Sequence, residues 1–387
     1  MSESDEESIT SDKGESVVAE DAVDLYENID EYFILLTDKK VKNRTTALTM
    51  IKNCLQRNYQ YEMFLKHYDS LTTDLLGMIK REKPLEYSTL ACRIISLLQL
   101  TLAQDTSSVF EISYPILMQR LKGSKSQVLI REILRCICTM AFICDTPDET
   151  LSEIMSCITT LLSTSKDNGV IETAISMWTL LSSVQPAYSI LSDSLPSFVQ
   201  LVLDHLTVND MDVRIAAAKC LAFVNELVVA TPSYQSDKPI TEIESSLSAC
   251  LAEYNRYWKG SKDKDKKMIL REVTRACSGS GHPDMHFMFK RSGVSEISID
   301  LSHWSEVAHY EMLRDLLGHG FLFHIIGNPL LSQIFGRCLT VQTVNRKEKH
   351  SMQAQGSEDK RSAIKENREK HMRELQAYEN MCIDDGY

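Results

Sequence analysis

A helix start recurs at regular intervals along the first two thirds of this chain. Similar amphipathic segments begin at Thr45, Ser88, Gln127, Ile171 and Asp212, about 40 to 44 residues apart. Armadillo and HEAT repeats have this period. One such unit cannot bury its apolar face alone, so neighbouring units stack into a solenoid with an elongated concave surface. The period therefore predicts an armadillo- or HEAT-like helical solenoid, a fold whose usual activity is binding.

The sequence between these starts is helical in character throughout. Apolar residues follow three-and-four spacing from Leu25 to Trp258, interrupted by short breaks such as Lys83-Pro84 and Thr146-Pro147. No alternating strand pattern interrupts it. An irregular all-α bundle would show the same amphipathic helices, and only the recurring period favours the solenoid over the bundle. We expect residues 25–281 to form the repeat domain.

The net charge of −12 is concentrated at the N-terminus. Residues 1–31 hold twelve Asp or Glu and one Lys, and we expect residues 1–24 to be an acidic disordered tail. Such a tail could shield basic patches, engage a basic partner, or only keep the chain soluble. The chain shows no apolar run of about 18 residues for a membrane span and no secretory signal. We expect a cytoplasmic protein, with the nucleus as a second location.

The eleven cysteines do not form a disulfide or metal framework. They are scattered through apolar helical patterns, which predicts reduced thiols packed as small hydrophobes. One array, Cys277-x4-His282-x3-His286, offers three zinc ligands in principle, with His303 as a fourth. No CxxC pair accompanies it, and scattered loop histidines are commoner than sites. We predict no metal ion here.

The chain also lacks the local signatures of an enzyme. The glycine pairs at Gly279–Gly281 and Gly318–Gly320 have neither the preceding strand nor the third glycine or lysine of a phosphate loop. No Ser, His and Asp set sits in a recognisable nucleophile elbow. We expect no catalytic residues, no cofactor and no small-molecule substrate.

The region after Gly281 differs from the repeats. The segment DMHFMFKRSGVSEISIDL alternates apolar and polar residues, which predicts a short two-stranded element. A helix follows over Glu306–Leu317, ends at Gly318 and turns through His319-Gly320. The chain then restarts as a helix near Asn328-Pro329 toward Phe335. We expect residues 282–339 to form a small C-terminal domain whose apolar residues hold it to the repeats.

Basic residues cluster in two places, Lys259–Arg275 and Arg346–Arg373. Apolar residues are too sparse after Val344 to give a helix a buried face, so we expect 340–387 to be a charged helical tail. Acidic residues in the same stretch also allow a simple solvated helix. The alternative is contact with RNA phosphates. The candidate RNA- or ribosome-binding residues are Lys259, Lys262, Lys264, Lys266, Lys267, Arg346, Lys349, His350, Lys360, Arg361, Lys365, Arg368, Lys370 and Arg373.

Three segments resemble one known family. They are YEMLRDLLGHGFLFHIIGNPLLSQIFG at 310–336, LTDKKVKNRTTALTMIKNCL at 36–55, and the lysine-rich lead-in and helix at Trp258–Cys277. Together they resemble the interferon-related developmental regulators over roughly residues 25–371. The resemblance places Arg346, Glu348 and His350 on the residues that open the family's basic C-terminal segment, and puts Lys360, Arg368 and Lys370 on its basic positions. The chain departs from that pattern at Glu358, Ile364 and Glu366, which weakens the implied RNA contact.

The resemblance implies a noncatalytic regulator of one of two kinds. Some family members dock on translationally idle ribosomes and place the C-terminal helix where mRNA would lie. Others are transcriptional co-regulators that recruit corepressor complexes. The first reading predicts contacts with small-subunit rRNA and proteins, and the second predicts protein partners in the repeat groove. Two separate basic clusters, and the lack of an apolar stripe assignable to a groove, favour the first.

Overall fold

The computed structural model describes residues 29–81, 84–103, 107–192, 194–231, 238–257, 264–279, 281–291 and 295–343. They fall into two compact units. The larger unit holds the described residues up to Phe287 together with Ile299–Leu339. Met288–Ser298 and the residues from Thr340 belong to the second unit. Within the described ranges, no helix combines the length and the apolar character that crossing a bilayer requires.

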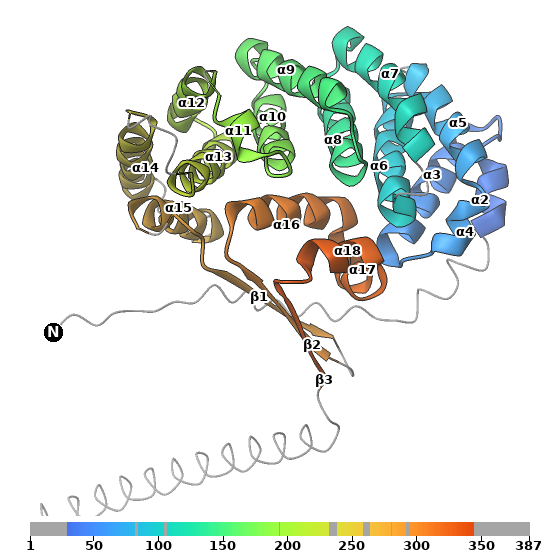
Figure 1. The fold of residues 1–387 in the computed structure, drawn as a ribbon. Helices are drawn as coiled ribbons and strands as arrows, with labels where there is room; N and C mark the ends of the chain where they lie inside the picture. Colours follow the sequence, from blue (N-terminus) through green and yellow to red (C-terminus); the bar gives the residue numbers. More distant parts are fainter. Residues whose placement is uncertain are drawn as a thin grey trace, which may run out of the picture. The chain divides into compact units, whose positions relative to one another are not determined.

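Five long helices form an inner layer, and each contains one of the predicted recurring starts. Each helix packs against the next along the chain, and the last packs against α15 (Lys264–Ser278) (Figure 1). This serial packing is that of a helical solenoid and confirms the predicted fold class. The inner helices are α3 (Val41–Arg57), α6 (Leu85–Leu102), α8 (Gln127–Ile143), α10 (Asn168–Ser182) and α13 (Met211–Val229).

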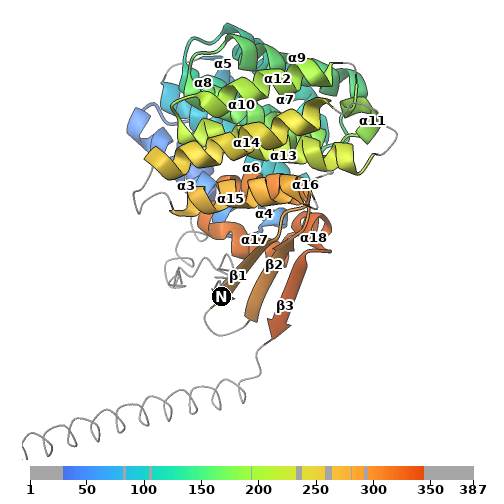
Figure 2. The same cartoon turned by 90° about the vertical axis from the view of Figure 1, so that its left-hand side faces the viewer.

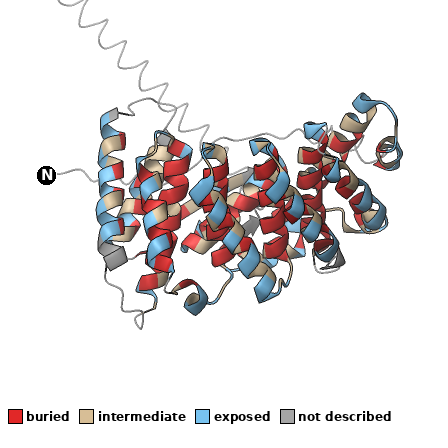
Figure 3. Ribbon diagram, turned by 90° about the horizontal axis from the view of Figure 1, so that it is seen from above, coloured by how far each residue is buried: buried red, intermediate tan, exposed pale blue. Residues whose placement is uncertain are grey.

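A second layer of helices covers the outer side of the inner layer. Helix α5 packs on α6, α7 on α8, α9 on α10, α12 on α13 and α14 on α15. Figure 3 shows buried and exposed residues on opposite sides of many helices, as amphipathic helices require. The outer and connecting helices are α2 (Ile29–Leu35), α4 (Tyr61–Leu65), α5 (Tyr68–Lys80), α7 (Ser107–Gly123), α9 (Asp148–Thr164), α11 (Ala187–Ile190), α12 (Leu195–Asp204), the 3-10 turn η3 (His205–Thr207) and α14 (Lys238–Tyr257).

Polar caps set where three of the inner helices begin. The Ser126 hydroxyl accepts from the Leu129 N–H, the Asp167 carboxylate from the Val170 N–H, and the Asp210 carboxylate from the Val213 N–H. Each bond satisfies a backbone donor that has no partner inside the first turn. The repeat phase read from the apolar pattern is therefore reinforced by local start signals.

The predicted two-stranded element is part of a larger sheet. Strands β1 (Met285–Arg291), β2 (Ser295–Leu301) and β3 (Leu339–Thr343) form a three-stranded sheet in the order β1-β2-β3 (Figure 2). The sequence analysis missed β3, because its five residues are too few to show a clear alternation. Its pairing partner lies far back in the chain, so no local pattern announces it.

The last helices differ in part from the prediction. Helix α16 (Trp304–Leu317) ends where expected, and Gly318–Gly320 forms the 3-10 turn η5. The chain then forms α17 (Phe321–Gly327), whereas we predicted that the next helix would begin only near Asn328, so the predicted restart was too late. The sequence FLFHII has one polar residue, His324, among five apolar ones and therefore shows no helical period. Helix α18 (Pro329–Phe335) begins as predicted, with the Asn328 side chain accepting from the Leu330 N–H.

Residues 299–339 belong to the same compact unit as the repeats, whereas we expected 282–339 to form a small domain beside them. The cysteines match the expectation of packed thiols: seven of the ten in the described residues are buried. Burial raises the pKa of the Cys54 thiol to about 12, which keeps it protonated.

Candidate functional site

Helix α16 lies along the concave side of the inner layer. It contacts α3, α6, α10 and α13, four helices spread over most of the repeats (Figure 1). Its buried residues include Met312, Leu313, Leu316 and Leu317, together with Trp304 in its first turn. The sequence analysis left this groove available to a partner. In the structure the chain's own helix α16 lies along much of this surface, which the sequence analysis did not predict.

A cavity of about 250 Å³ remains between α16 and the inner helices. Hydroxyl-bearing side chains of the inner helices line much of it. Cations and anions alternate along the same surface, from Arg93 on α6 through Glu132 and Arg135 on α8 and Glu172 on α10 to Lys219 on α13. Alternating signs allow each charge to find an opposite neighbour close by.

Two acidic residues of α16 pair with cations of this surface. The Arg93 guanidinium lies 3.0 Å from the Asp315 carboxylate and also donates to the Asp315 backbone carbonyl at 2.7 Å. The Lys219 ammonium lies 2.5 Å from the Glu311 carboxylate. The groove therefore recognises α16 by charge as well as by apolar burial.

The glycines of the 310–336 segment allow it to approach α3 closely. A Cβ atom on Gly320 would lie 1.5 Å from the Gln56 carbonyl oxygen, a distance at which no side chain fits. Gly318 ends α16 with a φ of 53°, in the left-handed region that glycine adopts at least cost. These two positions explain why the segment needs glycine on both sides of His319.

Two buried side chains of the same segment bind the carboxyl ends of repeat helices. The His324 Nε2 lies 2.9 Å from the Leu55 carbonyl in the last turn of α3. The Asn328 amide donates to the Leu100 carbonyl in the last turn of α6 at 3.0 Å. Carbonyls in the last turn of a helix have no hydrogen-bond donor within their own helix. These two bonds therefore satisfy acceptors that would otherwise be buried without a hydrogen bond.

Burial also sets the charge of two histidines in this region, His309 and His324. It lowers the pKa of His324 to about 4 and that of His309 to about 4, so both rings are neutral at pH 7. His309 lies on α16, where its Nε2 is 2.8 Å from the Ser183 hydroxyl and its ring packs on Phe142. Both rings act as packed hydrogen-bonding groups.

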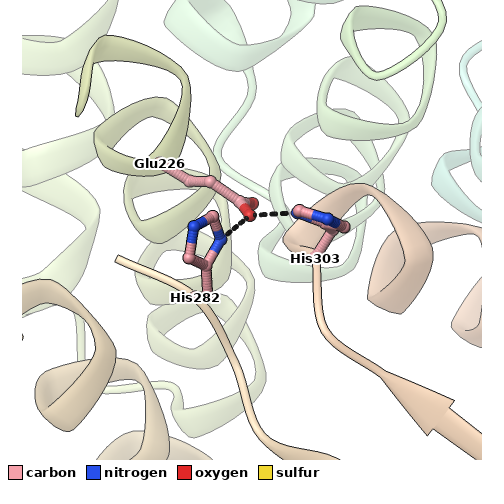
Figure 4. A group of neighbouring side chains, drawn as sticks. All are labelled: Glu226, His282 and His303. Atoms are coloured by element: carbon pink, nitrogen blue, oxygen red, sulfur yellow. Dashed lines mark hydrogen bonds and ion pairs between the residues drawn. The ribbon is translucent and has the colours of Figure 1, made fainter. Parts of the chain in front are cut away.

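A cluster of three side chains holds the start of α16. Figure 4 shows the Glu226 carboxylate of α13 between two imidazoles, His282 from the turn after α15 and His303 at the N-terminus of α16. Glu226 Oε1 lies 2.5 Å from His282 Nδ1 and 2.7 Å from His303 Nδ1. Glu226 Oε2 accepts from the Trp304 N–H at 2.8 Å, which satisfies a donor of the first turn of α16.

This cluster overlaps the array that the sequence suggested for zinc but differs in its members. His286 instead forms a hydrogen-bonded pair with the Asp300 carboxylate, and Cys277 is not part of the group. Glu226 was missed in the sequence analysis. The sequence did contain a signal for it, because Glu226 lies inside the apolar run LAFVNELVV. A carboxylate is rarely buried without a partner, so such a position indicates a paired acidic residue.

The predicted basic site is only partly within the described residues. Lys264, Lys266 and Lys267 lie in the first turn of α15, and the Lys266 ammonium is 2.6 Å from the Asp212 carboxylate. That pairing reduces the charge which Lys266 offers to an external phosphate. The other candidates lie outside the described residues: Lys259, Lys262, Arg346, Lys349, His350, Lys360, Arg361, Lys365, Arg368, Lys370 and Arg373.

These features define a class: a helical-repeat protein in which a helix that follows the repeats in the chain, α16, covers the concave surface. The model of the interferon-related developmental regulator family matches residues 1–278, and the chain belongs to that family. The resemblance inferred from the three sequence segments is thereby confirmed.

Relatives within the family are distant in sequence. Interferon-related developmental regulator 1 of Sus scrofa is 24% identical over 316 residues, covering 78% of this chain and 69% of the relative. Interferon-related developmental regulator 2 of Mus musculus is 25% identical over 336 residues, covering 81% and 73%. Among solved structures, a designed armadillo repeat protein is 13% identical with a TM-score of 0.41 and covers 64% of this chain and all of its own.

Proposed function

We propose that this chain is a noncatalytic cytoplasmic regulator that associates with ribosomes and represses translation. Residues 259–267 and 346–373 contact rRNA in this proposal, with the second segment lying on the mRNA path. Family membership supports a regulator. The family resemblance and the two basic segments support the ribosome as its partner.

The observation that favours this proposal most is the filled groove. A peptide bound on the concave side would have to displace α16, which buries Trp304 and Leu313 and forms the Arg93–Asp315 and Lys219–Glu311 pairs. Exposing two such side chains alone costs several kcal/mol, on the order of 2 to 3 kcal/mol each. A partner is therefore bound more easily by surfaces outside the groove, and the charged segments are the candidates.

The second basic segment has the charge that contact with nucleic acid requires. Residues 346–373 contain nine Lys or Arg and five Asp or Glu, so the segment is net positive while the whole chain is net negative. Binding through phosphates releases counterions, and affinity then falls steeply as salt concentration rises. Salt dependence is accordingly the property that separates this mode from binding to a protein surface.

Sucrose-gradient cosedimentation with purified ribosomes tests the proposal. The full chain is compared with a truncation after Thr343, which keeps strand β3, across a salt series. We expect the full chain to migrate with small subunits and whole ribosomes, and the truncation to bind at least tenfold more weakly. Lys122→Gln is the matched control, because Lys122 is an exposed cation of α7 paired with Glu153. The proposal fails if the full chain stays at the top of the gradient at low salt.

A second candidate is a transcriptional co-regulator that binds a protein in the groove. The cavity of about 250 Å³ and its alternating charges favour this reading, since a partner segment could replace α16 there. The substitution Lys219→Glu replaces the ion pair with Glu311 by a repulsion between two carboxylates, which should loosen α16. Under this second function, the variant should bind protein partners more tightly, and the binding should resist RNase. Unchanged or weaker binding would argue against this function.

A further inference from the structure

The cluster at the start of α16 combines groups that bind metal ions. We propose that Glu226, His282 and His303 form a binding site for one divalent transition-metal ion of the zinc type. The proposal departs from our sequence-based prediction of no metal, and it does not rest on ribosome association.

The three ligand atoms already converge. One carboxylate oxygen and two imidazole nitrogens lie within 4.8 Å of one another. Ligands about 2.0 Å from a tetrahedral zinc ion are roughly 3.3 Å apart. The 2.5 and 2.7 Å contacts from Glu226 Oε1 to the two Nδ1 atoms must therefore widen by less than about 1 Å.

The burial of each group suits that adjustment. The Glu226 side chain is 10% exposed and fixed, whereas the imidazoles of His282 and His303 are 44% and 52% exposed. The adjustment therefore falls on the two half-exposed rings and not on the buried carboxylate. Solvent can reach the ion from the same side and supply a fourth ligand, as happens when only three protein ligands are present.

A neighbouring hydrogen bond orients the carboxylate. The Trp304 N–H donates to Glu226 Oε2, which leaves Oε1 directed at the imidazoles. Partners of this kind hold ligating groups in place at known metal sites. The Trp304 indole N–H in turn donates to the Gly281 carbonyl at 3.1 Å, next to His282. Trp304 thus ties two of the three ligand-bearing segments together.

The donor set selects the kind of ion. Two imidazoles and one carboxylate, without a thiolate, suit zinc and its first-row neighbours, while magnesium and calcium prefer oxygen ligands alone. The three ligands come from α13, the turn after α15 and the start of α16. A bound ion would therefore fasten the start of the groove-filling helix to the repeats.

Isothermal titration of the metal-stripped full chain with ZnCl2 tests the site, with Glu226→Gln and His303→Asn as variants. We expect one zinc per chain and at least tenfold weaker binding in both variants. His286→Asn is the matched control, because His286 is a half-exposed histidine that pairs with Asp300 outside the cluster. It should bind zinc as the unaltered chain does, and circular dichroism would confirm that every variant is folded.

A second measurement identifies the ligands. Cobalt bound at this site should give the visible d–d bands of a four-coordinate ion, without the thiolate charge-transfer band that Cys277 would add. Zinc should also raise the melting temperature of the unaltered chain and of His286→Asn, but not of His303→Asn. The proposal is overturned if no zinc binds at about 100 µM, or if His303→Asn binds as tightly as His286→Asn.

Discussion

The segment from His303 to Asn328 contacts the repeats in two different ways at its two ends. At its far end, η5, α17 and Asn328 bring the backbone against α3 and α6 in a fully buried contact. At its near end, Glu226 holds α16 through two half-exposed imidazoles and one backbone N–H. The first contact depends on shape and the second on side-chain chemistry. Substitutions that add bulk should therefore destabilise the far end most, whereas metal ions in solution should change the stability of the near end.

The largest expected effect is steric. Gly320→Ala places a methyl group 1.5 Å from the Gln56 carbonyl, so α17 must move away from α3. We expect a loss of about 3 kcal/mol or more in the free energy of unfolding. Urea denaturation followed by circular dichroism measures it. Gly77→Ala on α5 is the control, because nothing lies within 4 Å of its Cβ and alanine favours a helix. Equal losses of stability in the two variants would show that the close approach of Gly320 to α3 does not require glycine.

The second effect concerns pH. Burial lowers the pKa of His324 to about 4, whereas the unfolded chain protonates this ring near pH 6.5. Its contribution to stability is therefore complete above about pH 6.5 and is lost as pH falls toward 4. Between pH 7 and 5 we expect a loss of about 2 kcal/mol from this residue.

His324→Gln isolates that contribution. The glutamine amide can still donate to the Leu55 carbonyl but does not titrate, so the variant should lose about 2 kcal/mol less between pH 7 and 5. Denaturant midpoints at both pH values measure the difference. His309→Gln should reduce the loss similarly, since burial lowers the pKa of His309 to about 4 as well. A pH dependence identical to that of the unaltered chain would contradict the burial of these rings.

A smaller effect is expected from the asparagine at the far end. Asn328→Ala leaves the Leu100 carbonyl and the Leu330 N–H without their partners, which should cost about 1 to 2 kcal/mol. Thermal unfolding monitors the loss. Asn168→Ala is the control, because its amide reaches Asp210 at the exposed surface and should cost under about 0.5 kcal/mol. If both variants lose the same amount of stability, the buried hydrogen bonds of Asn328 contribute no more than the exposed one of Asn168.

The smallest effect is expected from the ion pair between Arg93 and Asp315 in the last turn of α16. Arg93 and Asp315 are 26% and 53% exposed, so their coupling should be under about 1 kcal/mol and should shrink as salt is added. A double-mutant cycle with Arg93→Gln and Asp315→Asn measures it. A coupling well above that value would mean that charge, rather than apolar burial, holds α16 in the groove.

The repeat structure could be predicted because its pattern depends on residues that are close together in the sequence. The apolar period around Thr45, Ser88 and Ile171 gave the inner helices, and Gly318 and Asn328 marked helix ends through their own backbone chemistry. Strand β3 and helix α17 were missed because their short segments carry no period. Glu226 was missed as the partner of His282 and His303 because these histidines lie 56 and 77 residues away from it in the chain.

The sequence alone determined the helical-repeat class, the family and the position of the basic segments, since each depends on residues close together in the chain. Only the tertiary structure decided that α16 occupies the groove, and that His324 and Asn328 bind the ends of α3 and α6. It also decided which histidines join Glu226. These facts depend on contacts between residues more than 50 positions apart, whose geometry arises only when the stacked repeats place their helix ends side by side.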